Sequence, residues 1–203
     1  MNNLIEQLAS LFAEFPGIGE RQSKRFVYFL FRAPKEKRER IANLIKEISN
    51  SVSQCKSCFR YFDGKKDLCV ECSDENRDKS TIMVLEKDAD YEGMRKTHVY
   101  KGMYFIFGGT MPIVEKGGAN SFRTNELMSR IKRDLDKGTL KEVILAFSFS
   151  RDGDNTDMHL REVLGKEFGD KLKVTSLGRG LSTGTEIEYS DTETLENALS
   201  GRH

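Results

Sequence analysis

The first fifty residues carry apolar side chains at the three- and four-residue spacing of amphipathic helices. A Pro-Gly-Ile-Gly turn at residues 16–19 separates the first apolar segment from the second, and Pro34 precedes a third. The pattern predicts a helix, a tight turn, a second helix and then a third. The apolar positions behind this prediction are Leu4, Ile5, Leu8, Leu11 and Phe12, then Phe26, Val27, Phe29 and Leu30, then Ile41, Leu44, Ile45, Ile48 and Val52.

The pattern changes twice further along the chain. Residues 54–78 are rich in Cys, Asp, Lys and Ser and show little periodicity, which indicates a small module without a core of its own. From Thr81 onward, short apolar runs alternate with polar helical stretches, as is typical of an α/β domain with a mostly parallel sheet. The expected strands are 81–85, 104–107, 143–147 and 173–176, and the expected helices are 88–97, 121–135 and 154–168.

The last segment, residues 178–203, begins with turn-forming residues. Residues 186–189 then favour an edge strand, and residues 192–199 favour a short helix. The chain is therefore expected to divide into residues 1–53, 54–78, 79–177 and 178–203.

Charge and composition narrow the class of protein. The 203 residues are 37% hydrophobic and 32% charged, so a packed core is feasible, and a net charge of +1 argues against global disorder. Residues 1–70 carry a net charge of +5 and residues 71–203 one of −4. This asymmetry suggests a polyanion contact at one end and a metal or basic partner at the other, although a solvated charged helix at 35–40 gives the same excess.

The chain shows no sign of a membrane segment. Its longest apolar runs, such as Val143–Phe147, fall far short of the roughly 18 residues that cross a bilayer. Residues 1–15 lack the basic start of a signal peptide. We therefore expect a cytoplasmic protein without a membrane partner.

All four cysteines belong to two Cys-x-x-Cys pairs separated by ten residues, Cys55 with Cys58 and Cys69 with Cys72. Two such pairs can close four thiolates around one tetrahedral Zn²⁺. Two disulfides or a redox motif are the alternatives, but disulfides fit a cytosolic protein poorly and a redox site needs only one pair. The spacing favours a structural zinc site, without which so polar a segment should not hold together.

The turn before the second helix has features of an anion site. Gly17 and Gly19 let the backbone approach another molecule closely, and the following helix presents unpaired N–H groups at its N-terminus. Arg21, Lys24 and Arg25 lie on its first turns, so the element suits a nucleic-acid phosphate. An ordinary helix–turn–helix corner is the alternative, and the spacing leaves both open.

Acidic residues follow two of the expected strands. Glu86 and Asp90 come after the run 82–85, and Asp152 and Asp154 come after the run 143–147. Because the carboxyl ends of parallel strands meet at one edge of a sheet, both groups should reach the same edge. Carboxylates there could hold Mg²⁺, whereas a capped turn is the alternative for Asp152 and Asp154. The paired arrangement favours a functional edge.

The order of these parts resembles the RecR family of recombination mediators over essentially the whole chain. The resemblance implies a helix-hairpin-helix DNA-binding domain at 1–53, a four-Cys zinc finger at 54–78, a Toprim domain at 79–177 and an oligomerisation tail at 178–203. It rests on the Pro-Gly-Ile-Gly hairpin, the cysteine module, Glu86, Asp152-x-Asp154, Arg179-Gly180-Leu181, Glu188-Tyr189 and Gly201-Arg202.

The resemblance also implies residue roles and partners. Arg21 and Arg25 occupy the DNA-contact positions, the four cysteines match the zinc ligands, and the four acidic residues match Toprim positions that serve partner contact more than catalysis. RecR proteins form ring-like oligomers around DNA and act with RecO, and in some settings RecF, to load RecA on single strands. We therefore expect a homo-oligomer, dimer or tetramer, that binds gapped or junction DNA.

Three segments depart from the family pattern. Asp152-Gly153-Asp154 replaces Glu-Gly-Glu and looks more like the Asp-x-Asp of catalytic Toprim enzymes. Residues 111–116 replace Leu-Ser-Pro-Leu-Asp-Gly, and residues 180–184 replace Gly-Leu-Pro-x-Gly. These changes affect partner details and loop contacts.

Two function classes compete with a non-enzymatic mediator. One is a Mg²⁺-dependent Toprim nuclease or strand-transfer enzyme, with Glu86 as general base and Asp152 and Asp154 as metal ligands. The chain has no room for the extra domains of a topoisomerase or primase, and none of its six tyrosines is a candidate nucleophile. The other is a zinc scaffold without a nucleic-acid role, which leaves the hairpin arginines unexplained.

Overall fold

A computed structural model describes residues 3–113, 122–178, 180, 181, 184 and 186–200. The chain forms two compact units, Met1–Val52 and Ser53–His203, which are described in turn. Among the described residues, no helix is both long and apolar enough to cross a bilayer. Residues 114–116, 182 and 183, from two of the segments that depart from the family pattern, lie outside the described residues, as do residues 179, 201 and 202 of the closing stretch.

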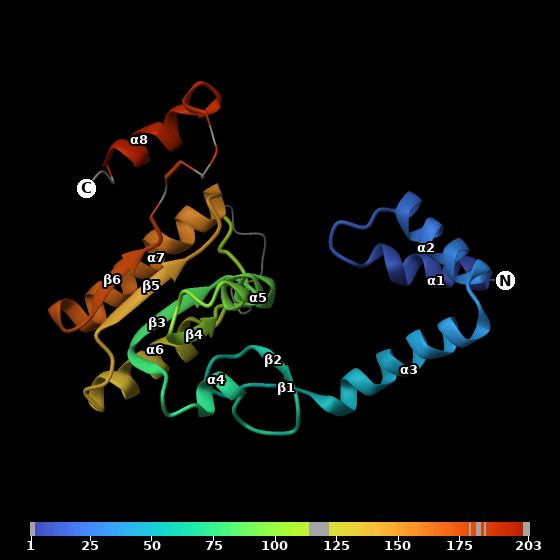
Figure 1. Ribbon diagram of the computed structural model, residues 1–203, viewed down its shortest axis with the longest axis horizontal. Helices are drawn as coiled ribbons and strands as arrows, with labels where there is room; N and C mark the ends of the chain where they lie inside the picture. The colour runs from blue at the N-terminus through green and yellow to red at the C-terminus, as the bar shows by residue number, and fades with distance from the viewer. Residues whose placement is uncertain (1–2, 114–121, 179, 182–183, 185, 201–203) are drawn as a thin grey trace. The chain divides into compact units, whose positions relative to one another are not determined.

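The first unit consists of three helices, as expected: α1 (Leu4–Ala13), α2 (Glu20–Arg32) and α3 (Lys35–Ser51) (Figure 1). The side chain of Asn3 caps α1 by accepting the N–H of Ile5. The ring of Phe12 meets the ring of Phe26 edge-on, with centroids 6.1 Å apart, and this contact joins α1 to α2. Val52, expected at the end of the third helix, instead begins strand β1, because the chain turns extended there (φ −98°, ψ 134°).

The second unit is built on a four-stranded parallel sheet, in agreement with the expected α/β class. Its strands are β3 (Asp78–Leu85), β4 (Gly102–Ile106), β5 (Glu142–Ala146) and β6 (Lys173–Ser176), in the order β4-β3-β5-β6. Leu85 pairs with Ile106 on one side and with Ala146 on the other, so three strands end level with one another. Its larger helices are α5 (Asp88–Thr97), α6 (Thr124–Asp136) and α7 (Arg151–Phe168), and the short helix η1 (Gly169–Lys171) follows α7.

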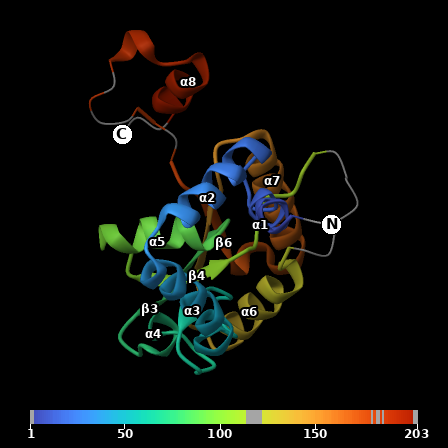
Figure 2. The same cartoon turned by 90° about the vertical axis from the view of Figure 1, so that its right-hand side faces the viewer.

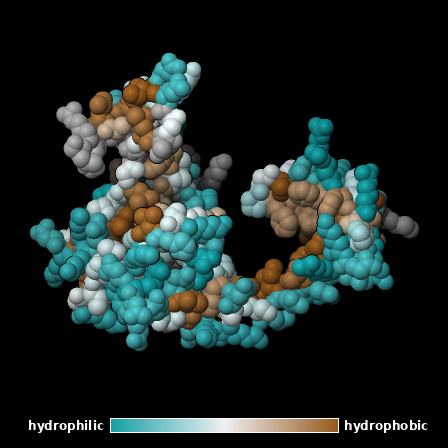
Figure 3. All heavy atoms as spheres, viewed as in Figure 1, coloured by the Kyte–Doolittle hydropathy of each residue, from teal (hydrophilic) through white to brown (hydrophobic). Residues whose placement is uncertain are grey.

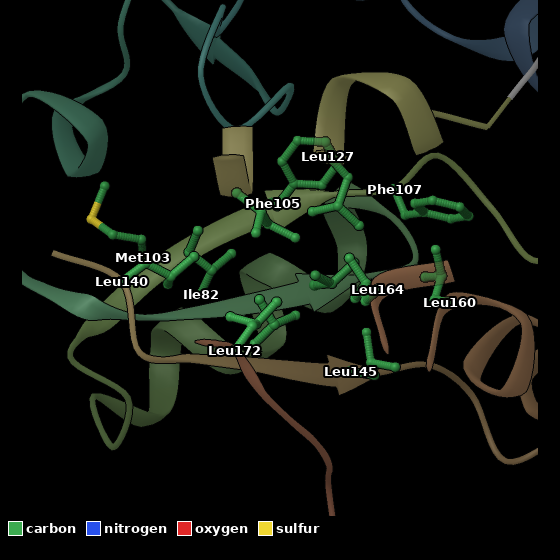
Figure 4. Close-up of a cluster of buried hydrophobic side chains, with 13 residues drawn as sticks. Ile82, Met103, Phe105, Phe107, Leu127, Leu140, Leu145, Leu160, Leu164 and Leu172 are labelled. Atoms are coloured by element: carbon green, nitrogen blue, oxygen red, sulfur yellow. The ribbon is translucent and has the colours of Figure 1, made fainter. Parts of the chain in front are cut away.

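Both faces of this sheet are buried, which explains its continuous apolar strands. Side chains alternate between the faces along a strand, so Ile82 and Val84 join the larger core while Met83 and Leu85 join the smaller one. Helices α6 and α7 complete the larger core, which Figure 4 shows, and α5 covers the opposite face (Figure 2). The fully buried helical contributors to the larger core are Leu127, Ile131, Leu160 and Leu164.

The tail corrects one expectation. Residues 186–189 form no edge strand; Ile187–Tyr189 is the short helix η2, closed by the N–H of Tyr189 donating to the Glu186 carbonyl at 3.1 Å. The alternating polar and apolar residues resemble a strand, but Ile187 and Tyr189 are exposed and pair with no sheet among the described residues. The helix expected next is present as α8 (Thr192–Ser200).

The start of α7 yields the first prediction. A Cβ at Gly153 would lie 1.9 Å from the Ser148 carbonyl oxygen, whereas a Cβ at Gly165 in the same helix would meet nothing within 4 Å. We expect Gly153→Ala to lower the free energy of unfolding by about 1–3 kcal/mol and Gly165→Ala to raise it by up to about 1 kcal/mol. Urea unfolding followed by circular dichroism measures both, and equal midpoints would contradict the close contact.

Candidate metal centre and nucleic-acid interface

The four cysteines converge on one point of a small module that also contains β1 (Val52–Gln54), β2 (Tyr61–Asp63) and the one-turn helix α4 (Val70–Ser73). Their four sulfur atoms all lie within 4.8 Å of one another. The sulfurs of Cys58 and Cys69 are 3.6 Å apart, far beyond a disulfide bond. Sulfurs bound to one tetrahedral zinc lie about 3.8 Å apart, so the spacing fits a shared metal ion.

Each Cys-x-x-Cys pair is closed by a similar backbone turn. The N–H of Phe59 donates to the Cys55 carbonyl at 2.9 Å, and the N–H of Ser73 donates to the Cys69 carbonyl at 3.0 Å. The N–H of Cys69 also donates to the Cys55 sulfur at 3.4 Å, which favours a thiolate there. The two turns therefore have the same backbone closure, and the backbone itself favours a thiolate at Cys55.

The electrostatics of the cluster call for a cation. Hydrogen bonding with Cys58 lowers the pKa of the Cys55 thiol, and the same contact raises the pKa of Cys58. Four sulfurs this close, three of them on buried cysteines, cannot all ionise together unless a positive charge lies among them. A divalent metal ligated by all four would remove this conflict, so the residues fit the group that their spacing predicts.

The module is bonded to the α/β sheet around its ligands. The N–H of Ile106, at the end of β4, donates to the Cys58 carbonyl at 2.8 Å. Phe59, held in a left-handed backbone conformation (φ 63°), packs edge-on against Phe105 with centroids 5.4 Å apart. The N–H of Tyr61 donates to Asp88 at 2.9 Å, so the loop also contacts the start of α5.

Three polar residues, Arg60, Glu71 and Tyr91, form a hydrogen-bonded network at the cysteine module that the sequence analysis did not predict. The guanidinium of Arg60 and the hydroxyl of Tyr91 both donate to the carboxylate of Glu71. Burial alone would raise the pKa of that carboxyl, but the hydrogen bond from Tyr91 and the charge of Arg60 lower it overall. The sequence gives one local sign of this network: two opposite charges, Arg60 and Glu71, lie in a module that has few apolar residues.

The turn between α1 and α2 places the expected phosphate-binding residues on one exposed helix start. Gly17 adopts a positive φ of 75°, and Gly19 caps α2 without a side-chain hydrogen bond to its first turn. Arg21, Lys24 and Arg25 follow at positions that share one face of α2, and all three are exposed. The geometry thus offers free backbone donors next to positive side chains.

The acidic residues do reach the carboxyl edge of the sheet, but as separate groups. Asp90 accepts the N–H of Lys87 at 3.1 Å in a capping box at the start of α5. Asp152 and Asp154 lie in the first turn of α7, which begins at Arg151 because the Ser150 side chain caps it. Across the described part of the chain, only the four cysteines bring three or more His, Cys, Asp or Glu side chains close enough to share a metal ion. The acidic residues of this edge form no such cluster.

The side chain of Glu86 differs from the other three. It follows β3 and is 15% exposed, and one carboxylate oxygen lies 3.4 Å from the Lys87 ammonium. The other oxygen is buried without a hydrogen-bond partner among the described residues. Asp152, in contrast, accepts the N–H of Ile113 at 3.4 Å.

Comparison with known proteins decides the family. Residues 80–178 match the family model of the Toprim domain, and residues 180–203 match that of the RecR C-terminal region. Recombination protein RecR of Dehalococcoides mccartyi is 37% identical over 202 residues, which cover 100% of this chain and 93% of the relative. The chain belongs to the RecR family.

Further RecR relatives align over nearly the same length. Recombination protein RecR of Chloroherpeton thalassium is 34% identical over 99% of this chain and 97% of its own length. The RecR protein of Chlorobium limicola is also 34% identical, over 98% of this chain and 95% of its own length. The alignments include the hairpin and the cysteine module as well as the Toprim domain.

The convergence of the cysteines yields the second prediction. Cys58→Ser should lose bound zinc and much of its solubility, because three thiolates no longer close the site and the module has little core to replace it. Metal content per chain, measured by mass spectrometry after gel filtration, tests this. Ser57→Ala, which changes the neighbouring residue that contacts Arg130, should keep the full metal content; a soluble Cys58→Ser with full zinc would contradict the four-ligand site.

Proposed function

We propose that this chain is a DNA-binding recombination mediator of recombinational repair that carries structural zinc and does not itself cut DNA. The observation that carries the proposal is its full-length relationship to proteins named for recombination rather than for an enzymatic activity. In this proposal the hairpin domain (1–53) contacts DNA, the zinc finger (54–78) is structural, and the tail (178–203) serves oligomerisation. RecO, and in some settings RecF, are the proposed protein partners.

The proposed DNA contact is the turn and first two turns of α2. Free N–H groups at a helix start, the partial positive charge of its dipole and three exposed cations all favour a phosphate. Backbone contacts of this kind position a protein on DNA without reading bases. The binding residues proposed are Gly17, Gly19, Arg21, Lys24 and Arg25.

The proposed metal is zinc, held by Cys55, Cys58, Cys69 and Cys72. Four soft thiolates in tetrahedral spacing suit Zn²⁺ better than Mg²⁺ or Ca²⁺, which prefer oxygen ligands. Such a closed site keeps no position for water or substrate. Its contribution is therefore to folding rather than to chemistry.

The acidic edge is proposed as a contact surface for a protein partner. Glu86, Asp90, Asp152 and Asp154 give it negative charge, which suits a basic partner surface. Separate caps and first-turn positions account for most of these carboxylates without Mg²⁺. The nuclease alternative rests on the Asp152-Gly153-Asp154 sequence, with Glu86 as its general base.

The first unit supports a homo-oligomer. Among its described residues only Ala9, Ser23 and Val27 are buried, and α3 buries none. Leu44, Ile45 and Ile48 form an apolar stripe on α3 that is 51–61% exposed (Figure 3). A unit this small buries too little surface to be stable alone, and the same stripe on a second copy would complete its core.

The third prediction tests DNA binding. The double variant Arg21→Ala/Arg25→Ala should bind a labelled gapped duplex at least about tenfold more weakly. The slope of log affinity against log salt should fall by about two for each protomer on the DNA. Lys65→Ala/Lys66→Ala removes the same charge from exposed positions of the second unit and should bind nearly as the wild type does.

The same samples, with Mg²⁺ added, separate the mediator from the nuclease. A native gel should show bound DNA and a denaturing gel intact strands. Unchanged binding by the arginine variant would count against the proposed interface. Cleavage that Asp152→Asn abolishes would move the protein to the catalytic Toprim enzymes.

The fourth prediction tests the apolar stripe. Ile45→Glu should lower the molar mass measured by light scattering, because a charge on this stripe cannot be buried between copies. Asn43→Glu, at an exposed polar position of the same helix, should leave the mass unchanged. A wild-type monomer, or an unchanged mass for Ile45→Glu, would contradict the proposed contact.

A further inference from the structure

We propose that Arg60 is a positioning residue of the metal centre, which from outside the ligand set holds Glu71, between Cys69 and Cys72, and together with Tyr91 fixes the metal module to α5. The inference rests on the proposed zinc ion. It concerns Arg60, Glu71 and Tyr91, which neither the ligand spacing nor the family resemblance identifies.

Arg60 is enclosed by groups that suit a cation. Its side chain is 11% exposed, and its guanidinium carbon lies 4.5 Å from the ring centroid of Tyr91 and 5.8 Å from that of Phe62. One terminal nitrogen donates to Glu71, while the buried Nε has no hydrogen-bond partner among the described residues. A buried donor without a partner is costly, and the ion pair with Glu71 and the two aromatic rings offset that cost.

The charge of the centre requires such a cation. Four thiolates around one Zn²⁺ leave two excess negative charges in a buried position, and Glu71 adds a third beside them. An arginine side chain keeps its proton at physiological pH, and Arg60 pairs with the Glu71 carboxylate. Arg60 therefore supplies positive charge beside the ligands.

The other cations near the loop have different partners. Arg130 is also buried, but it pairs with Asp134 at 2.5 Å and donates to the Ser57 carbonyl at 3.1 Å. Lys56 is 71% exposed and pairs with Asp67 at 2.8 Å. Arg130 thus joins the first cysteine pair to α6, whereas Arg60 joins Glu71 of the second pair to Tyr91 of α5.

The network continues from the ligands into the fold. Glu71 lies in α4 between Cys69 and Cys72, and it accepts hydrogen bonds from both Arg60 and Tyr91. Tyr91 belongs to α5 and packs edge-on against Tyr104 of β4 with centroids 5.1 Å apart. Because burial raises the pKa of Tyr91, its hydroxyl remains a donor at neutral pH. Arg60 and Glu71 therefore link the metal ligands to the helix that carries Asp90.

The fifth prediction measures metal release from the full-length protein. Zinc content of the wild type is determined first, and then its transfer to excess 4-(2-pyridylazo)resorcinol is followed by absorbance. We expect Arg60→Gln to release zinc about tenfold faster or more, as is typical when a group supporting a ligand is lost. Arg60→Lys keeps the charge without the planar fork and should restore part of the difference. Lys56→Gln, which breaks the exposed ion pair of the same module, should release zinc at the wild-type rate.

A second readout separates positioning from general loosening. Alkylation with N-ethylmaleimide, followed by peptide mass spectrometry, should modify Cys69 and Cys72 ahead of Cys55 and Cys58 in Arg60→Gln, because Arg60 contacts Glu71, which lies between the second pair of cysteines. Equal modification of all four cysteines would overturn the positioning role. If Arg60→Gln is insoluble, Tyr91→Phe, which removes only the hydroxyl, should release zinc faster than the wild type does.

The outcomes distinguish this inference from the proposed metal. A zinc-loaded wild type whose release rate stays within about twofold in Arg60→Gln, or in Tyr91→Phe where that variant replaces it, would overturn the inference alone. A wild-type protein that carries no zinc would overturn the zinc assignment and the inference with it.

Discussion

The convergence of four sulfur atoms is the constraint on which the middle of this protein depends. The cysteine module has a two-stranded ribbon, a one-turn helix and few buried apolar side chains, so burial of hydrophobic surface alone cannot hold it together. The Cys58 carbonyl accepts the N–H of Ile106, and Phe59 packs on Phe105. Ligation of the proposed metal would hold these anchors to the sheet in place, because they lie at a ligand or next to one.

The parallel sheet imposes a second arrangement. Because three strands end level, the starts of α5 and α7 and the acidic residues that follow the strands share one edge. Carboxylates in the first turn of a helix are favoured by its dipole, so Asp152 and Asp154 stabilise α7 whatever else they contact. The fold alone therefore explains these two carboxylates, and contact with a basic partner is a separate proposal.

Features that repeat locally were predictable from the sequence, and features that depend on distant pairing were not. The helices, the strands of the sheet and the sulfur cluster follow from periodicity and spacing. Residues 186–189 alternate between polar and apolar side chains like a strand, but among the described residues no neighbouring strand pairs with them. Local backbone hydrogen bonds therefore form the short helix η2 instead. Arg60, Glu71 and Tyr91 are 11 and 20 residues apart in sequence, and polar residues at such separations leave no pattern that identifies them as partners.

The weakness of the first unit as an isolated domain links assembly to DNA binding. In the proposed function each protomer would offer only a few phosphate contacts at the start of α2, and the counterion release from so few contacts would support weak affinity. The same unit leaves the apolar stripe of α3 uncovered. Burying this stripe between copies would stabilise the unit and also place several basic helix starts on one DNA molecule, where their contacts add at high effective concentration. One surface would then serve both purposes, so loss of assembly should weaken DNA binding even when every basic residue is intact.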